Sequence, residues 1–128
     1  MAITDWRIEL ITLPVADVDR AKEFYVDKLG WNADHDHRVS PTLRFVQITP
    51  PGSACSIAFG EGLTEREPGT MSGLQIVIPD ADAALEHLRE NGVAADGVAE
   101  LDWGRFVSFA DPDGNEWTLQ QLPPRPAS

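Results

Sequence analysis

The chain has 128 residues, 42% of them hydrophobic, a formal net charge of −11 and a single cysteine. This length fits one domain, and the excess of acidic residues argues against nucleic-acid binding, which needs clustered Lys and Arg. One cysteine excludes an internal disulfide, and no run of about 18 apolar residues could cross a membrane. We therefore predict a cytoplasmic protein with neither a nucleic-acid nor a membrane partner.

The first half of the chain predicts a strand, a helix and three more strands. β-branched and apolar residues predict a strand over 7–15, after which Asp17 is a suitable N-cap for a helix that runs to about Leu29. Apolar residues recur in this helix at three- and four-residue spacing, and Gly30 is a typical stop. The three further strands are predicted over 31–39, 43–49 and 54–60.

The same order of elements returns in the second half. Residues 78–84 repeat the cap, the second acidic residue and the alanine of residues 15–21, which indicates an internal repeat. A turn over Asp111–Asn115 (Asp-Pro-Asp-Gly-Asn) joins two runs rich in β-formers and predicts a tight hairpin. The predicted elements are a strand over 73–79, a helix from Asp80 to Asn91, a strand over 93–100 and a hairpin over 105–120.

These elements predict one domain made of two modules. The first module covers about 7–60, a loop over 61–70 joins it to the second module at about 72–122, and a frayed tail follows at 123–128.

Two segments carry a resemblance to a known family. Residues 13–25 (Leu-Pro-Val-Ala-Asp-Val-Asp-Arg-Ala-Lys-Glu-Phe-Tyr) and residues 109–115 (Phe-Ala-Asp-Pro-Asp-Gly-Asn), set in two βαβββ copies, resemble the vicinal oxygen chelate superfamily. This superfamily includes glyoxalases, bleomycin-resistance proteins and extradiol dioxygenases. The resemblance implies an α+β fold in which two tandem βαβββ modules form a curved, cup-like mixed sheet, and it implies a homodimer.

The resemblance also locates the positions at which the metal enzymes of this superfamily hold their metal. Those enzymes use four ligands, usually His and Glu, on the first and last strands of each module. The residues of this chain at the four positions are Leu10, Ala58, Gly73 and Thr118. None of these side chains offers an imidazole, carboxylate or thiolate group. We therefore predict no metal at the family positions and no cofactor.

His35 and His37 are the other candidates for a metal. Because they are two residues apart on a predicted strand, their side chains point the same way and could hold an ion together. The charged residues around them, Asp34, Asp36 and Arg38, favour a solvated strand instead. The sequence therefore favours the solvated strand, and a metal held by the two histidines is the alternative.

Strand alternation predicts small and mildly polar side chains on the concave face, a lining that suits binding better than chemistry. Trp103 and Arg105 resemble the Trp-Gly-x-Arg segment of bleomycin-resistance proteins, here one residue shorter, and could stack on a flat guest and hold an oxygen. No catalytic residue is predicted. The predicted ligand-binding residues are Thr12, Phe45, Ala58, Gln75, Trp103, Arg105, Thr118 and Gln120.

The sequence thus predicts a metal-free small-molecule-binding protein of the bleomycin-resistance type, which sequesters a planar, aromatic antibiotic or natural product. The acidic surface would attract a cationic ligand, or would serve only solubility. The alternative is an enzyme: a glyoxalase-like lyase or isomerase, or a dioxygenase, working without a metal or with a displaced metal site. Binding is favoured over catalysis.

Overall fold

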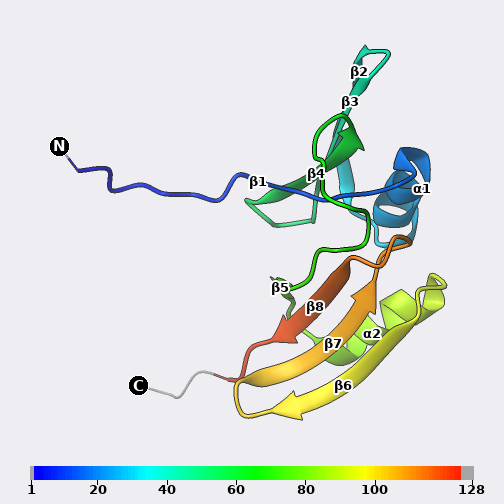
Figure 1. Cartoon of the computed structure of the whole chain (residues 1–128). Helices are drawn as coiled ribbons and strands as arrows, with labels where there is room; N and C mark the ends of the chain where they lie inside the picture. Colours follow the sequence, from blue (N-terminus) through cyan, green and yellow to red (C-terminus); the bar gives the residue numbers. More distant parts are fainter. Residues whose placement is uncertain (1, 125–128) are drawn as a thin grey trace. The chain divides into compact units, whose positions relative to one another are not determined.

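A computed structural model describes residues 2–124 of the chain, in two units that each build a separate four-stranded sheet (Figure 1). The units are Met1–Pro68 and Gly69–Ser128. Each contains the order strand, helix, strand, strand, strand, which confirms the predicted repeat and the α+β class. The end of the predicted frayed tail, residues 125–128, lies outside the described residues.

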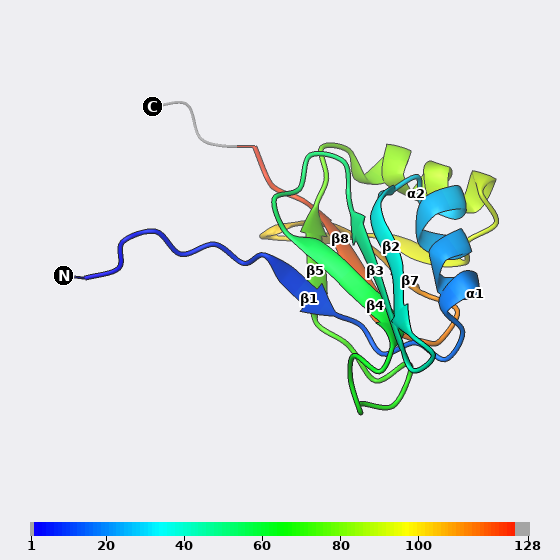
Figure 2. The same ribbon diagram turned by 90° about the horizontal axis from the view of Figure 1, so that it is seen from above.

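In the first unit, the four strands lie in the order β1-β4-β3-β2 (Figure 2). β1 pairs in parallel with β4, and the other neighbours are antiparallel. The strand predicted over 7–15 is shorter in the structure, since only Leu10–Thr12 pairs with β4 and Pro14 has no N–H to donate. The elements are β1 (Leu10–Thr12), α1 (Val18–Lys22), η1 (Glu23–Lys28), β2 (Asn32–Ser40), β3 (Leu43–Thr49) and β4 (Ser56–Glu61).

The helix predicted from Asp17 to about Leu29 consists of two segments. Asp17 caps α1 as expected, because its carboxylate accepts a hydrogen bond of 3.1 Å from the Arg20 amide. From Glu23 the helix widens to a π-helical pattern, in which the Leu29 amide donates to the Phe24 carbonyl five residues earlier, at 3.0 Å. The buried Tyr25 ring packs against Phe59 of β4, with 5.8 Å between the ring centroids.

The second unit repeats this topology, with strand order β5-β8-β7-β6 and β5 parallel to β8. Two side chains cap the N-terminus of its helix. The Ala83 amide donates to the Asp80 carboxylate at 3.1 Å, and the Ala81 amide donates to the Gln121 side chain of β8 at 2.8 Å. The elements are β5 (Leu74–Val77), α2 (Ala81–Glu90), β6 (Ala95–Leu101), β7 (Gly104–Ala110) and β8 (Glu116–Gln121).

The turn between β7 and β8 is held by a buried polar network, and this confirms the predicted hairpin. One Asp111 oxygen accepts from the backbone amides of Asp113 at 3.0 Å and Asn115 at 2.9 Å. The Asn115 side chain donates to the other Asp111 oxygen at 2.8 Å and accepts from the Met71 amide at 3.1 Å. Residues near Met71 are thereby fastened to the hairpin before β5 begins.

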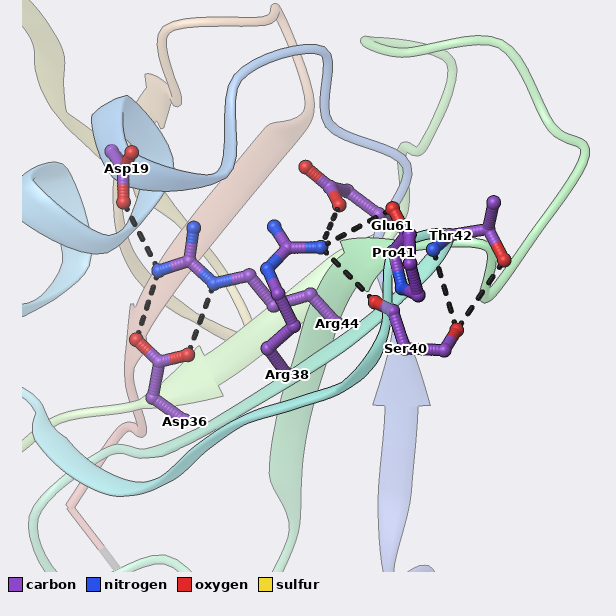
Figure 3. Close-up of polar contacts among 8 residues, drawn as sticks. All are labelled: Asp19, Asp36, Arg38, Ser40, Pro41, Thr42, Arg44 and Glu61. Atoms are coloured by element: carbon purple, nitrogen blue, oxygen red, sulfur yellow. Dashed lines mark hydrogen bonds and ion pairs between the residues drawn. The ribbon is translucent and has the colours of Figure 1, made fainter.

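In the first unit an arginine ties the helix to the sheet (Figure 3). Arg44, the second residue of β3, contacts Asp36 of β2 at 2.9 Å and Asp19 of α1 at 3.0 Å. Lys22 of α1 donates to the same Asp36 carboxylate at 2.9 Å. Arg38, further along β2, forms a separate ion pair with Glu61 at 2.8 Å.

The second unit has the same connection at the equivalent place. Arg105, the second residue of β7, makes two hydrogen bonds of 2.9 and 3.2 Å to Asp82 of α2 and one of 3.0 Å to Glu100 of β6. Asp82, like Asp19, is the second residue of its helix. The repeated pattern indicates that both arginines hold a helix on its sheet.

The Asp36 network predicts a pH-dependent contribution to stability. Hydrogen bonds from Arg44 and Lys22 hold the pKa of the Asp36 carboxyl well below its ordinary value of 3.8. Since the folded pKa is lowered, the stabilisation is present above the unfolded value and is lost as the pH falls through about 4 and below. We expect Asp36→Asn to lower the free energy of unfolding by about 1 kcal/mol at neutral pH, a modest figure because the pair is partly solvated.

This difference should shrink in urea unfolding experiments at about pH 3, where wild-type Asp36 is increasingly protonated in the unfolded chain. Asp27→Asn on η1 is the matched control, because Asp27 is exposed and has no ion-pair partner among residues 2–124. A wild-type to Asp36→Asn difference that stays constant from pH 7 to pH 3 would contradict the assignment.

Candidate functional site

Each sheet has one face toward its own helix and one face away from it. In the second unit, Arg105 and Gln121 bond to α2, so the side chains in phase with them on β7 and β8 point toward the helix. Four of these are buried and apolar: Val107, Phe109, Trp117 and Leu119. We call the opposite face, which carries Ser108, Thr118 and their in-phase neighbours, the helix-free face of the second sheet.

A hollow of about 380 Å³ lies on this helix-free face. Two carboxylates, from Asp96 and Glu116, and two hydroxyls, from Ser108 and Thr118, supply its polar groups. Ser108 is the direct cross-strand partner of both Asp96 and Thr118, so three adjacent strands contribute. Within the described part of the chain, neither Asp96 nor Glu116 has an ion pair or a side-chain hydrogen bond. The lining residues are Ala94, Asp96, Ser108, Phe109, Ala110, Glu116, Trp117 and Thr118.

Two glutamine amides lie next to the hollow and are held in place by each other. Gln75 of β5 is the cross-strand partner of Thr118, and its side-chain amide donates to the side-chain carbonyl of Gln120 at 2.5 Å. Gln120, which is 9% exposed, in turn donates to the Trp103 backbone carbonyl at 2.9 Å. The chain of hydrogen bonds fixes the orientation of both amides beside the hydroxyl of Thr118.

Trp103 lies at the turn between β6 and β7, and its indole is 61% exposed. The Phe106 ring, on the helix-free face of β7, lies edge-on to it, with the centroids 6.4 Å apart. An aromatic pair, in which Trp103 is exposed and Phe106 is half-buried, thus lies at the opposite end of β7 from Ala110 and the hollow.

Five of the predicted ligand-binding residues belong to the second unit, and the structure brings three of them together. Gln75, Thr118 and Gln120 share the helix-free face, and Gln120 contacts the Trp103 backbone. Arg105 lies on the other face, where hydrogen bonds to Asp82 raise the pKa of its guanidinium. Its donors are occupied by two carboxylates, so we leave Arg105 out of the proposed site.

The other three predicted residues, Thr12, Phe45 and Ala58, share the helix-free face of the first sheet. Thr12 pairs directly with Ala58, and Phe45 lies on the neighbouring strand β3. The same face carries a chain of hydrogen bonds, because Gln47 donates to Ser56 at 3.4 Å and the Ser56 and Thr49 hydroxyls are 2.6 Å apart. Thr49 donates in turn to the Asp34 carboxylate.

Of the four residues that supply the polar groups of the hollow, the sequence analysis selected Thr118 as a ligand-binding residue and did not select Asp96, Ser108 or Glu116. Ser108 and Glu116 could have been found from the alternation on either side of the Asp111–Asn115 turn, because both are in phase with Thr118. Asp96 could not, since β6 contains an irregularity between Gly97 and Ala99 that changes its register against β7.

The family metal positions do not fit a divalent ion. Leu10 and Ala58 are apolar, Gly73 has no side chain, and Thr118 offers only a neutral hydroxyl. In the portion from residue 2 to residue 124, no three His, Cys, Asp or Glu side chains gather in a way that could hold a metal. Over the same portion, no helix is long and apolar enough to span a membrane.

The chain belongs to the Glyoxalase/Bleomycin resistance protein/Dioxygenase superfamily, whose family model matches residues 7–119. It is similar to the crystal structure of TnmS3, an antibiotic binding protein from Streptomyces sp. CB03234, with 36% identity, 96% of this chain and 99% of that one covered, and a TM-score of 0.85.

Two further relatives are similar over most of the chain. A superfamily member from Sphaerobacter thermophilus DSM 20745 is 33% identical, with 91% of this chain and 98% of that one covered and a TM-score of 0.82. The uncharacterized protein YetH of Bacillus subtilis (strain 168) is 25% identical over 117 residues, which are 90% of this chain and 98% of YetH.

Proposed function

We propose that this protein binds and sequesters a small planar, aromatic molecule, of the antibiotic or natural-product class, without the aid of a metal. The observation that carries the proposal is the hollow of about 380 Å³ on the helix-free face of the second sheet. Pockets for small ligands combine a concave surface with a few fixed polar groups. The antibiotic-binding description of TnmS3, at 36% identity, supports the choice of ligand class.

The polar groups at this site favour recognition over reaction. The Ser108 and Thr118 hydroxyls and the Gln75 and Gln120 amides can orient a guest by hydrogen bonds. A hydroxyl needs an adjacent base, such as histidine or lysine, to act as a nucleophile. Among residues 2–124, no histidine or lysine forms a hydrogen bond with either hydroxyl. The exposed Trp103 ring and the half-buried Phe106 ring supply flat apolar surface on the same unit.

We also propose that the preferred guest carries a positive charge. Asp96 and Glu116 place two carboxylates in the hollow, and no Lys, Arg or His among residues 2–124 forms an ion pair with either of them. A cationic group that enters the hollow would gain charge-assisted hydrogen bonds that an uncharged analogue cannot make. The net charge of −11 would attract the same guest from a distance.

We further propose that the protein acts in the cytoplasm as a homodimer. The apolar side chains of Ile3, Trp6 and Ile8, which are 67 to 78% exposed, supply surface that a second copy could cover. Sedimentation-equilibrium mass measurement tests this: twice the mass of the chain supports the dimer, and the mass of one chain contradicts it.

The binding proposal is tested by a panel of planar polycyclic antibiotics, each offered with its free amine and in the N-acetylated, uncharged form. We expect saturable quenching of tryptophan fluorescence, with the amine bound about tenfold more tightly than its N-acetyl partner at low salt. The difference should fall in Asp96→Asn/Glu116→Gln. No binding by any member would contradict the proposed function, whereas equal affinity for both forms would contradict only the charge preference.

A further inference from the structure

The helix-free face of the first sheet carries a second feature, which the proposed function does not use. His35 and His37 both lie on β2 and point to this face, since their cross-strand partners are Gln47 and Phe45 of β3. Their imidazole rings are stacked, with an interplanar angle of 27° and 5.7 Å between centroids. Both residues are exposed, and among residues 2–124 neither ring has a hydrogen-bond partner.

We infer that His35 and His37 form a binding site for a divalent transition metal of the zinc, nickel or copper group. Imidazole is a suitable ligand for all three ions. Two metal–nitrogen bonds of about 2.0–2.1 Å require ring nitrogens roughly 3 Å apart, a spacing that two adjacent imidazoles reach by small side-chain rotations. The site uses none of the four residues at the family metal positions, and it belongs to the first unit, whereas the hollow belongs to the second.

Gln47 supplies the third donor. It is the direct cross-strand partner of His35, and its amide nitrogen donates to the Ser56 hydroxyl at 3.4 Å. Its carbonyl oxygen accepts no hydrogen bond from any group within the described range and is available to a cation. Two imidazoles and one amide oxygen leave open coordination positions for water or for a donor atom of another molecule.

The neighbouring carboxylates do not belong to the site. Asp36 lies between the two histidines in sequence but points to the helix side, where Arg44 and Lys22 hold it. Asp34 accepts hydrogen bonds from Thr49 and from the Asn32 side chain. The affinity therefore depends on the two imidazoles, which makes the site sensitive to loss of either one.

Titration of the tag-free protein with zinc, nickel and copper salts tests the inference. We expect about one equivalent bound per chain, with affinity lowered about tenfold or more in His35→Asn and in His37→Asn, because a single imidazole is a weak ligand. Both positions are exposed, so the variants should fold. His87→Asn on α2 and Cys55→Ser are the matched controls and should bind as the wild type does, because each removes a lone potential ligand.

Electron paramagnetic resonance of the copper-loaded protein gives a readout that does not depend on affinity. Hyperfine structure from two equivalent imidazole nitrogens supports the site, and a spectrum with one nitrogen, or with sulfur, contradicts it. Binding that persists in His35→Asn/His37→Asn, or no binding by the wild type at about 1 mM metal, would also overturn the inference. Neither result would bear on the hollow of the second unit.

Discussion

Asn115→Ala should lower the free energy of unfolding by about 3 kcal/mol, the largest stability change that we expect from a single polar substitution in this chain. Asn115 is fully buried, and its side chain joins the Asp111 carboxylate to the Met71 amide. Alanine would remove both hydrogen bonds and leave a buried carboxylate oxygen and a backbone N–H without these partners. Urea unfolding followed by circular dichroism measures the change.

Asn91→Ala is the matched control for this prediction. Asn91 is exposed at the end of α2, and its side-chain amide donates a hydrogen bond of 2.8 Å to the His87 backbone carbonyl and lies 3.4 Å from the His87 Nδ1 atom. Water can replace these exposed contacts, so we expect a change within about 0.5 kcal/mol. If both variants lost the same small amount, the buried network around Asp111 would not be the main support of the hairpin.

The polar turn was predictable because its determinants are local. The sequence Asp-Pro-Asp-Gly-Asn contains the groups that close the turn, and the Asp17 and Asp80 caps bond to amides three residues away. The role of Met71 was not predictable, since its partner Asn115 is distant in sequence. The wide turn of η1 was also missed, because Glu23–Lys28 has the apolar spacing of an ordinary α-helix.

Arg105 illustrates why the site was harder to predict than the fold. Its neighbours Trp103 and Gly104 match a family segment, which suggested a ligand contact. The position of Arg105 on β7 indicates a different role. Arg105 lies two residues before the buried Val107, so both side chains point to the same face of the sheet. The Arg105 guanidinium donates to the Asp82 carboxylate of α2. The sequence does not show where this helix packs on the sheet.

Ser108→Phe should weaken ligand binding about 100-fold or more, the largest functional change that we expect from one substitution. Ser108 is exposed at the centre of β7, pairs with both Asp96 and Thr118, and points into the hollow. A phenyl ring there would take up much of the 380 Å³ that a planar guest needs. Phenylalanine is a good strand former, so the sheet should remain intact.

Val39→Phe is the control, because it introduces the same side chain at an exposed position of β2, 66% exposed, in the other unit. Fluorescence titration with the tightest binder of the antibiotic panel should give wild-type affinity for this variant, and both variants should unfold at the wild-type urea midpoint within error. Normal affinity in Ser108→Phe would place the guest elsewhere and remove the hollow from the proposed function. Equal loss in both variants would show that added aromatic surface, rather than a filled hollow, impairs binding.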